Sequence, residues 1–260
     1  MKRAERLSRI LDRLAEQGRV DVEEIANDLG VSAATVRRDF DALAAQQLLT
    51  RTHGGAVSNG TAYDLPMRYR SQRHASDKKR IAEAAAELVH PGMIVGVNGG
   101  TTTTEVARTL AARPDLVGGE RQALTVVTNA LNIANELTVR GHVKIVATGG
   151  VARPQSYELI GPLATRTLEG IALDVAFLGV DALDVRDGAA AHHEDEANVN
   201  RLLAQRAGQV VVVTDSSKLG RRAFARICST DEIDLLVTDR DAPVDVVAGL
   251  RSAGVDVRLV

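Results

Sequence analysis

Short apolar runs rich in valine, leucine and isoleucine recur along the C-terminal part of this chain, and segments of helical character separate them. The runs are residues 93–97, 124–128, 143–147, 175–180, 210–214 and 235–238. Strands of a parallel sheet have this continuous apolar character because helices cover both faces of the sheet. The pattern therefore predicts an α/β unit with a mainly parallel sheet, which we place at residues 76–260.

Polar or glycine-rich turns follow five of these runs. They comprise Asn98, Gly99, Gly100, Thr101, Thr102, Thr103 and Thr104 before a helix expected at 105–112; Thr128 and Asn129; Thr148, Gly149 and Gly150; Val180 and Asp181; and Asp215 to Lys218. The carboxyl ends of parallel strands share one edge of a sheet, so these turns are expected to form one ligand site. Glycines, hydroxyls and helix-start amides suit a phosphate or another anion. The alternative is plain helix capping at each turn and a solvated position for Lys218.

The segment before this unit shows the spacing of a helix-turn-helix. An apolar stripe predicts a first helix that ends near Gly18, and a second helix is expected at 23–29. Gly30 permits a tight turn, and Ser32 is a suitable N-cap because its hydroxyl can accept a bond from a first-turn amide. The third helix that follows is expected to face a core with Val36, Phe40 and Leu43.

The surface of this third helix carries Ala33, Thr35, Arg37 and Arg38. Residues near the N-terminal end of such a helix contact base edges in the major groove of DNA. Arginine can bind guanine O6 and N7, whereas serine and threonine commonly hold phosphates. A solvated face on an ordinary helix is the alternative, so the DNA hypothesis depends on the surrounding sequence.

Two short strands, expected at 48–51 and 56–57, complete the N-terminal unit as a wing. The glycine pair between them, Gly54 and Gly55, is expected to supply positive φ in a hairpin turn. Arg51 and His53 are candidates for contact with DNA from this wing, and a structural role in the turn is the alternative for His53. Three helices and a hairpin predict a winged helix-turn-helix.

Composition excludes several other classes of protein. The net charge is −2, so charge alone does not indicate nucleic-acid binding. The single cysteine, Cys228, rules out an internal disulfide and fits a reducing compartment. No apolar run approaches the roughly 18 residues that span a bilayer, so we expect a cytoplasmic protein without a membrane partner. Adjacent His192 and His193 do not converge on one ion as an i, i+4 pair would, so neither a metal nor another cofactor is expected.

The N-terminal residues resemble the signature of DeoR-type bacterial transcriptional regulators. The similar segments are Arg6-x3-Ile10-x3-Leu14, then seventeen residues, then Ser32-x2-Thr35-Val36-Arg37-Arg38-Asp39-Phe40, and Arg51-Thr52-His53-Gly54-Gly55-Ala56. The resemblance implies that Ser32, Thr35, Arg37 and Arg38 contact double-stranded operator DNA. It does not identify which of them contact bases.

The C-terminal turns are similar to the sensor domain of the same family, whose fold resembles ribose-5-phosphate isomerase. That resemblance implies a phosphorylated sugar as effector, with its phosphate held by residues 98–104 and Lys218. Asn129, Gly150 and Asp181 would then lie near the sugar. Asn98 and Ala182 depart from residues common in relatives. The acidic helix start at 191–197 resembles a subgroup that binds amino-sugar or tagatose-type phosphates.

Three functional hypotheses follow. The first is a transcriptional regulator, a repressor of a carbohydrate-utilisation operon, with residues 1–58 binding DNA, 59–75 as linker and 76–260 as sensor. The second is a sugar-phosphate isomerase-like enzyme with an appended DNA-binding domain, for which Asp181, Asp184 and Glu196 are the available carboxylates. The third is a constitutive DNA-binding protein. The sequence shows no complete catalytic constellation, so we expect a regulator, acting as a homo-oligomer (dimer or tetramer) because one recognition helix covers few base pairs.

Overall fold

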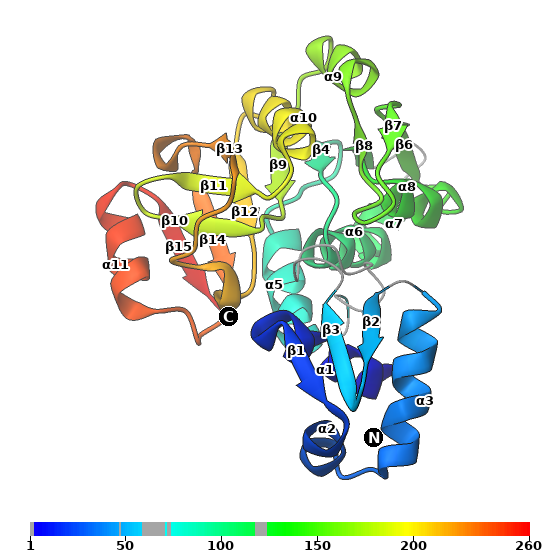
Figure 1. The fold of residues 1–260 in the computed structure, drawn as a ribbon. Helices are drawn as coiled ribbons and strands as arrows, with labels where there is room; N and C mark the ends of the chain where they lie inside the picture. Colours follow the sequence, from blue (N-terminus) through cyan, green and yellow to red (C-terminus); the bar gives the residue numbers. More distant parts are fainter. Residues whose placement is uncertain (1–2, 47, 59–70, 72–73, 118–123) are drawn as a thin grey trace. The chain divides into compact units, whose positions relative to one another are not determined.

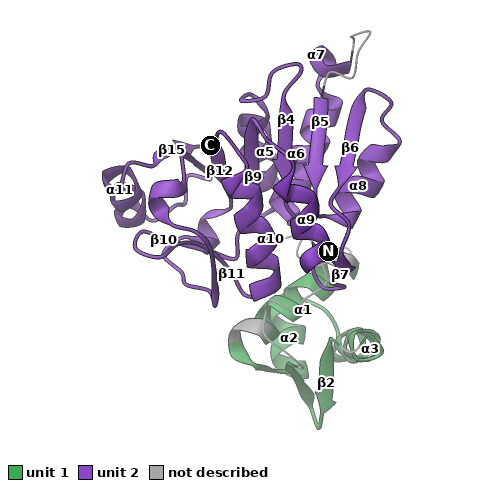
Figure 2. Cartoon of the chain, turned by 90° about the horizontal axis from the view of Figure 1, so that it is seen from above, with its two compact units in different colours: residues 1–73 green, residues 74–260 purple. Residues whose placement is uncertain are grey.

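The structure is a computed structural model that describes residues 3–46, 48–58, 71, 74–117 and 124–260. Two compact units divide the chain, residues 1–73 and 74–260, and Figure 2 colours them separately. Most of the linker expected at 59–75 lies outside the described residues. The domain limits expected from the sequence therefore remain a proposal.

The residues of unit 1 that the structure describes form three helices and a three-stranded antiparallel sheet (Figure 1). The helices are α1 (Arg3–Gln17), α2 (Val22–Leu29) and α3 (Ala33–Ala44). The strands are β1 (Arg19–Asp21), β2 (Leu49–Thr52) and β3 (Gly55–Ser58), in the order β1-β3-β2. The predicted winged helix-turn-helix is confirmed, with β1 as a third strand of its sheet.

The core of unit 1 fixes α3 in place. Val36, Phe40 and Leu43 are fully buried on one side of α3, as their helical spacing predicts. Asp39 is also buried, and it accepts hydrogen bonds from Arg6 of α1 at 2.5 and 3.2 Å. A buried carboxylate needs such a partner because desolvation of an unpaired charge is costly. Arg6 and Asp39 of the signature are therefore structural residues that join α1 to α3.

The two glycines of the wing have different roles, which corrects the expectation that both supply positive φ. Gly54 lies in the turn with φ of 87°, in the left-handed region that favours glycine. Gly55 has no positive φ, but it pairs with Asp21 of β1. A Cβ at Gly55 would lie 2.2 Å from the carbonyl oxygen of Val20. Gly55 is thus required by the close approach of β3 to β1.

A seven-stranded parallel sheet forms the centre of unit 2. Its strands are β4 (Ile94–Val97), β5 (Leu124–Thr128), β6 (Val143–Ala147), β9 (Val175–Leu178), β12 (Val210–Val213), β14 (Leu235–Thr238) and β15 (Asp256–Leu259). All neighbouring pairs are parallel, in the order β15-β14-β12-β9-β4-β5-β6. The six expected strands and their parallel arrangement are confirmed. The edge strand β15, half polar and largely exposed, is absent from the sequence prediction.

Helices cover both faces of this sheet (Figure 1). On one face lie α5 (Ala75–Ala86), α6 (Thr101–Ala112), α7 (Pro114–Val117) and α8 (Leu131–Thr138). On the other lie α9 (Pro162–Glu169), α10 (Glu194–Gln205), α11 (Val244–Ser252) and a small antiparallel sheet of β10 (Ala182–Asp184), β11 (Gly188–Ala191) and β13 (Ala225–Cys228). Side chains of β12 therefore point alternately to the two faces of the sheet. Val211 and Val213 pack against the α5–α8 face, and Val210 and Val212 pack against the α9–α11 face. Continuous apolar runs result from burial on both faces.

The described part of unit 2 also contains a short hairpin and two 3-10 turns. A two-stranded hairpin, β7 (Val151–Ala152) and β8 (Leu159–Ile160), precedes α9. The 3-10 turns η2 (Ser216–Lys218) and η3 (Thr230–Glu232) follow β12 and β13.

Two helices begin earlier than the sequence predicts. The helix expected at 105–112 starts at Thr101, so its threonines belong to the first helical turn. The alanine-rich stretch 81–89 predicts a further helix in the sequence, and the structure has this helix at Ala75–Ala86. In both cases polar first-turn residues were interpreted as the loop before the helix, although such residues are favourable in a first turn because its amides lack intrahelical partners.

The order of the strands reverses between β4 and β9. From β4 the chain proceeds through β5 to β6 in one direction, and from β9 through β12 and β14 to β15 in the other. The helices after β4 and β9 therefore diverge, and in open α/β sheets ligands bind in the crevice at this switch point.

Replacement of Gly55 tests the packing of the wing. We expect Gly55→Ala to destabilise unit 1 by about 1–3 kcal/mol, the usual cost of overpacking, because its Cβ would meet the Val20 carbonyl group. Denaturant unfolding followed by circular dichroism would measure the loss. Gly170→Ala is the control, since a Cβ there meets no atom within 4 Å. Equal stability of the two variants would contradict the assigned role of Gly55.

Candidate functional site

Reciprocal hydrogen bonds join the ends of β4 and β9 at the switch point. The Asn98 side-chain amide donates to the Gly179 carbonyl oxygen at 2.9 Å, and the Gly179 amide donates to Asn98 Oδ1 at 2.8 Å. Asn98 is 1% exposed, so both bonds are shielded from solvent. The side chain of Asn98 is therefore used in joining two strands, and its backbone starts the turn that leads into α6.

The turn from β4 to α6 presents backbone amides. Gly99 and Gly100 precede α6, and the first amide groups of a helix have no intrahelical partner. The hydroxyls of Thr103 and Thr104 both donate to the Gly100 carbonyl oxygen, at 3.2 and 2.6 Å. Thr104 also accepts a bond from Asn132 at 2.9 Å. Two of the four threonine hydroxyls therefore brace the turn.

Thr101 and Thr102 complete the polar surface at this end of α6. Thr101 is half-buried, and Thr102 is 7% exposed. Positive electrostatic potential at a helix N-terminus favours negative charge. The β4–α6 turn, defined as Gly99, Gly100, Thr101 and Thr102, is hereafter called the anion cradle.

Glu158, which the sequence analysis did not select, lies against this cradle. Its side chain is buried, and Oε1 accepts a hydrogen bond of 2.8 Å from the Gly99 amide. The amide of Asn200 lies 3.4 and 3.5 Å from the two carboxyl oxygens. Burial raises the pKa of Glu158 well above the ordinary glutamate value, repulsion from Glu196 and Asp181 also raises it, and the bonds from Asn200 and Gly99 oppose the rise.

Further polar side chains extend the site toward β5 and α10. Asn129, fully buried after β5, donates to Asn200 Oδ1 at 3.3 Å, while its own Oδ1 has no hydrogen-bond partner among the described residues. Glu196 of α10 pairs with Arg153 at 3.1 Å. The end of β5 and the first half of α10 thus meet around Glu158.

The other predicted residues lie at the same edge of the sheet with separate contacts. The Thr128 hydroxyl accepts from the Ala130 amide at 3.0 Å. Gly149 and Gly150 follow β6 with positive φ, and a Cβ at Gly150 would lie 2.7 Å from the Ile160 carbonyl oxygen. Asp181 accepts from the His192 amide at 3.0 Å. These positions are consistent with one edge but do not identify ligand contacts.

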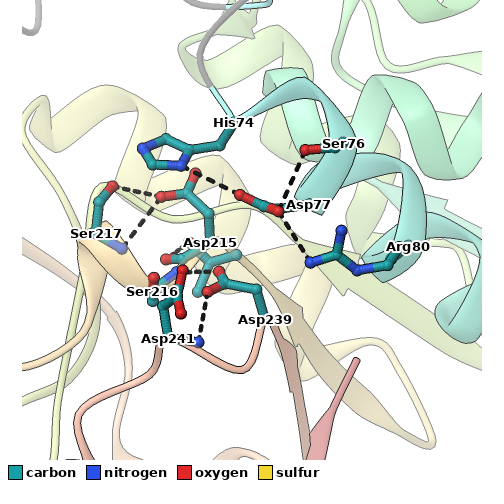
Figure 3. A network of polar contacts seen from close by, with 10 residues as sticks. His74, Ser76, Asp77, Arg80, Asp215, Ser216, Ser217, Asp239 and Asp241 are labelled. Atoms are coloured by element: carbon teal, nitrogen blue, oxygen red, sulfur yellow. Dashed lines mark hydrogen bonds and ion pairs between the residues drawn. The ribbon is translucent and has the colours of Figure 1, made fainter.

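Lys218 ends the 3-10 turn η2, which belongs to a second polar cluster around Asp215. The Lys218 amide donates to the Asp215 carbonyl oxygen at 3.1 Å within η2. Asp215 also caps η2, accepting from the Ser217 amide at 3.2 Å, and Asp239 accepts from the Ser216 amide at 2.6 Å (Figure 3). This cluster follows β12 and β14, whereas the anion cradle follows β4.

The start of α5 faces this second cluster. His74 and Asp77 lie beside Asp215, and Asp77 pairs with His74 and Arg80 at 3.2 and 2.9 Å (Figure 3). Lys78 of the same helical turn is 3% exposed. Burial would raise the pKa of Asp215, but the Ser217 hydrogen bond and the charges of Lys78, His74 and Lys218 hold it below the ordinary value. The cluster therefore retains a buried anionic carboxylate.

Two further features of the described residues concern possible nucleophiles and metal ligands. Cys228 is buried, and burial raises the pKa of its thiol to about 12, which makes it a poor nucleophile. Within the described residues, no group of His, Cys, Asp and Glu has an arrangement that could hold a metal ion. None of the helices placed by the structure has the length and apolar character needed to cross a membrane.

The candidate DNA-binding surface lies at the N-terminal end of α3. Gly30, with φ of 62°, ends α2, and Ser32 caps α3 by accepting from the Thr35 amide at 3.2 Å. The Ser32 and Thr35 hydroxyls also contact each other at 3.0 Å. Ser32 is therefore confirmed as the N-cap, and its hydroxyl is partly used within the helix.

Exposed basic groups surround this helix end. Arg37 is 54% exposed and 3.7 Å from Glu23, and Arg38 is exposed without an acidic partner among the described residues. Arg51 of the wing contacts Asp41 at 2.5 Å, and exposed His53 lies in the wing turn. Ala33 packs partly against the core. Arg37 and Arg38 are thus exposed basic side chains in the first half of α3.

This combination defines a class of protein, a DNA-binding transcriptional regulator with an α/β sensor domain. Residues 6–62 match the DeoR-like helix-turn-helix domain, and residues 73–240 match the DeoR C terminal sensor domain. The chain therefore belongs to the DeoR family of transcriptional regulators.

Full-length relatives agree with this assignment. The "Putative aga operon transcriptional repressor" of Escherichia coli O157:H7 is 37% identical over 99% of this chain and 94% of its own length. The regulator GlpR of Haloferax volcanii is 36% identical over 98% and 96%, respectively. The glycerol-3-phosphate regulon repressor of Escherichia coli K12 is 30% identical over the whole of both chains. These names support a regulator and not an enzyme.

Solved structures show a more distant likeness. Ribose 5-phosphate isomerase A from Methanocaldococcus jannaschii is 19% identical with a TM-score of 0.42, covering 56% of this chain and 55% of that chain. A likeness at this level carries no information about ligand or activity.

A signal for Glu158 is present in the sequence, although it is weak. Glu158 is a single acid between Tyr157 and the apolar pair Leu159-Ile160, where an isolated charge needs a partner if it is buried. The strands on either side have two residues each, too short for periodicity to reveal. The sequence signal thus marks Glu158 as an unusual acid, but the hairpin that positions it is seen only in the folded chain.

The raised pKa of Glu158 predicts a pH-dependent stability difference. An unfolded glutamate ionises near pH 4.3, but the native site resists ionisation, so the wild type loses stability as pH rises above that value. Glu158→Gln removes this penalty. We expect it to unfold at a higher temperature than the wild type at pH 8, with the advantage disappearing below about pH 4.

Thermal unfolding at several pH values measures this effect. Exposed Glu169, at the end of α9, supplies the control Glu169→Gln, which should show no such trend. An advantage of Glu158→Gln that grew toward acid pH would show that Glu158 is ionised and favourably paired.

Proposed function

We propose that this protein is a repressor of a carbohydrate-utilisation operon, and that a phosphorylated sugar bound in unit 2 changes its affinity for operator DNA. Membership of the DeoR family carries the DNA-binding part of this proposal. The anion cradle at the sheet's switch point carries the effector part. Several relatives are named as repressors, which supports repression as the direction of control.

Contact with DNA is assigned to Ser32, Ala33, Thr35, Arg37 and Arg38 of α3, with Arg51 and His53 of the wing. The exposure of both arginines at the start of α3 supports direct contact with bases or phosphates. Operators of helix-turn-helix proteins commonly contain two half-sites, which supports binding as a homo-oligomer, a dimer or a tetramer.

Binding of the effector is assigned to two groups of residues. The phosphate is assigned to residues 98–104, because unpaired helix-start amides and the helix dipole favour an anion. The sugar is assigned to residues at the ends of β5, β6 and β9, which range from fully buried to exposed. These are Thr128, Asn129, Gly149, Gly150 and Asp181. Lys218, which follows β12 on the opposite side of β9 from β4, is assigned to the phosphate together with residues 98–104.

Operator affinity tests the assignment of α3. We expect Arg37→Ala and Arg38→Ala each to weaken operator binding by about 1–3 kcal/mol where the arginine contacts a base. An arginine that contacts phosphate would instead lower the dependence of log K on log salt by about one unit. Fluorescence anisotropy with a duplex selected from a random pool, at several salt concentrations, separates the two cases. Arg140→Ala, which removes one exposed charge from unit 2, is the control.

A panel of phosphorylated sugars tests the effector. At a concentration of a hundred times Kd, the true effector should stabilise the protein by about 2.7 kcal/mol. It should also change operator affinity by about 1–3 kcal/mol, and operator DNA must change effector affinity by the same factor. Thermal unfolding and anisotropy measure these effects, with the unphosphorylated sugars as controls. The absence of any response across the panel would refute sugar-phosphate sensing but not DNA binding.

A further inference from the structure

An acidic side chain already holds one amide of the anion cradle. The Gly99 amide donates to Glu158 Oε1 at 2.8 Å, and a Cβ at Gly99 would lie 2.4 Å from Glu158 Cγ. The carboxyl group is therefore packed directly on the turn. Gly99 lies one residue before Gly100, the N-cap of α6, so the Glu158 carboxyl group occupies an amide of the turn that an external anion would also use.

The β7–β8 hairpin delivers this side chain into the cradle. Tyr157, the preceding residue, has φ of 61°, a conformation that side-chain-bearing residues rarely adopt. Backbone bonds hold it there: the Leu131 amide donates to the Tyr157 carbonyl oxygen at 2.9 Å, and the Leu159 amide to that of Asn129 at 2.6 Å. Strained backbone conformations of this kind are maintained by their surroundings and occur at ligand clamps and switch regions.

The charges around Glu158 oppose a second anion. Glu196 and Asp181 both repel a negative charge on Glu158, and Arg153 pairs with Glu196 at 3.1 Å. Asn129 Oδ1, fully buried in the same cluster, has no partner among the described residues. A phosphate in the cradle would lie close to Glu158, because both would use the Gly99 amide.

We propose that Glu158 is an internal competitor for the anion cradle, which a phosphate-bearing ligand must displace from the Gly99 amide in order to bind. This inference rests on the proposed function, because it concerns the same phosphate site. Displacement moves Glu158 away from Gly99 and with it the β7–β8 hairpin. Arg153, in the loop of the hairpin, and Asn129, beside the hairpin, become available to the remainder of the ligand.

Inorganic phosphate is the probe, because it carries the predicted chemistry without a sugar. The full-length protein labelled with ¹⁵N is titrated with phosphate, and the amide resonances of Gly99, Thr101 and Thr102 report binding. Removal of the competitor in Glu158→Ala should tighten phosphate binding about tenfold or more, since release of one bond to a charged group has that effect. Glu158→Gln keeps the shape without the charge, so at pH 8 it should bind phosphate more tightly than the wild type.

Several outcomes separate the two proposals. Glu169→Ala removes an exposed glutamate of the same unit and should bind phosphate as the wild type does. If the wild type binds phosphate at Gly99 and both Glu158 variants bind it equally or more weakly, Glu158 is a ligand or a scaffold residue and the competitor is refuted. If no variant shifts the Gly99, Thr101 and Thr102 resonances, the cradle does not bind phosphate, and the proposed effector site fails together with this inference. The more conservative Glu158→Gln decides the matter if Glu158→Ala does not fold.

Discussion

The pair of hydrogen bonds between Asn98 and Gly179 is the contact on which the arrangement of the sensor site depends. It joins β4 and β9 at the one place in the sheet where the strand order reverses. Hydrogen bonds between strands hold the rest of the sheet, but beyond its carboxyl edge the chain leaves in two directions. A single buried amide holds the two exits together because it can donate and accept at once. The β4–α6 turn and the turn to Asp181 therefore have a fixed separation.

The buried polar groups around this contact differ in how completely they are hydrogen-bonded. The Asn98 side chain both donates a hydrogen bond to Gly179 and accepts one from it. The hydroxyls of Thr103 and Thr104 donate to the Gly100 carbonyl oxygen. Glu158 is different, since its second carboxyl oxygen has only a distant partner in Asn200. A buried carboxyl with one good hydrogen bond is costly to ionise. The β4–α6 turn is thus held by fully paired groups on one side and by the single good hydrogen bond of Glu158 on the other.

The sequence predicted those features that repeat along the chain. Buried strands such as Val210–Val213 were recognisable because both faces are apolar, and α3 was recognisable from Ser32 and the spacing of Phe40. Features that depend on tertiary contact were not predictable. Gly55 has no sequence signal that distinguishes close approach from positive φ. Glu158 becomes a site residue only because a hairpin with two residues in each strand brings it to Gly99.

The first turn of α5 links the start of unit 2 to the polar cluster around Asp215. The second compact unit begins at His74, so any signal carried along the chain toward unit 1 must pass the first turn of α5. Buried Lys78 and exposed His74 of that turn both act on the charge of Asp215, which starts the segment that ends at Lys218. Lys218 and Lys78 both act on the charge of Asp215, and Lys78 lies in the first turn of α5, close to the start of unit 2. Because β12 adjoins β9 in the sheet, this cluster and the Asn98–Gly179 contact lie on successive strands. The first turn of α5 therefore faces the cluster that follows β12, one strand away from the Asn98–Gly179 contact.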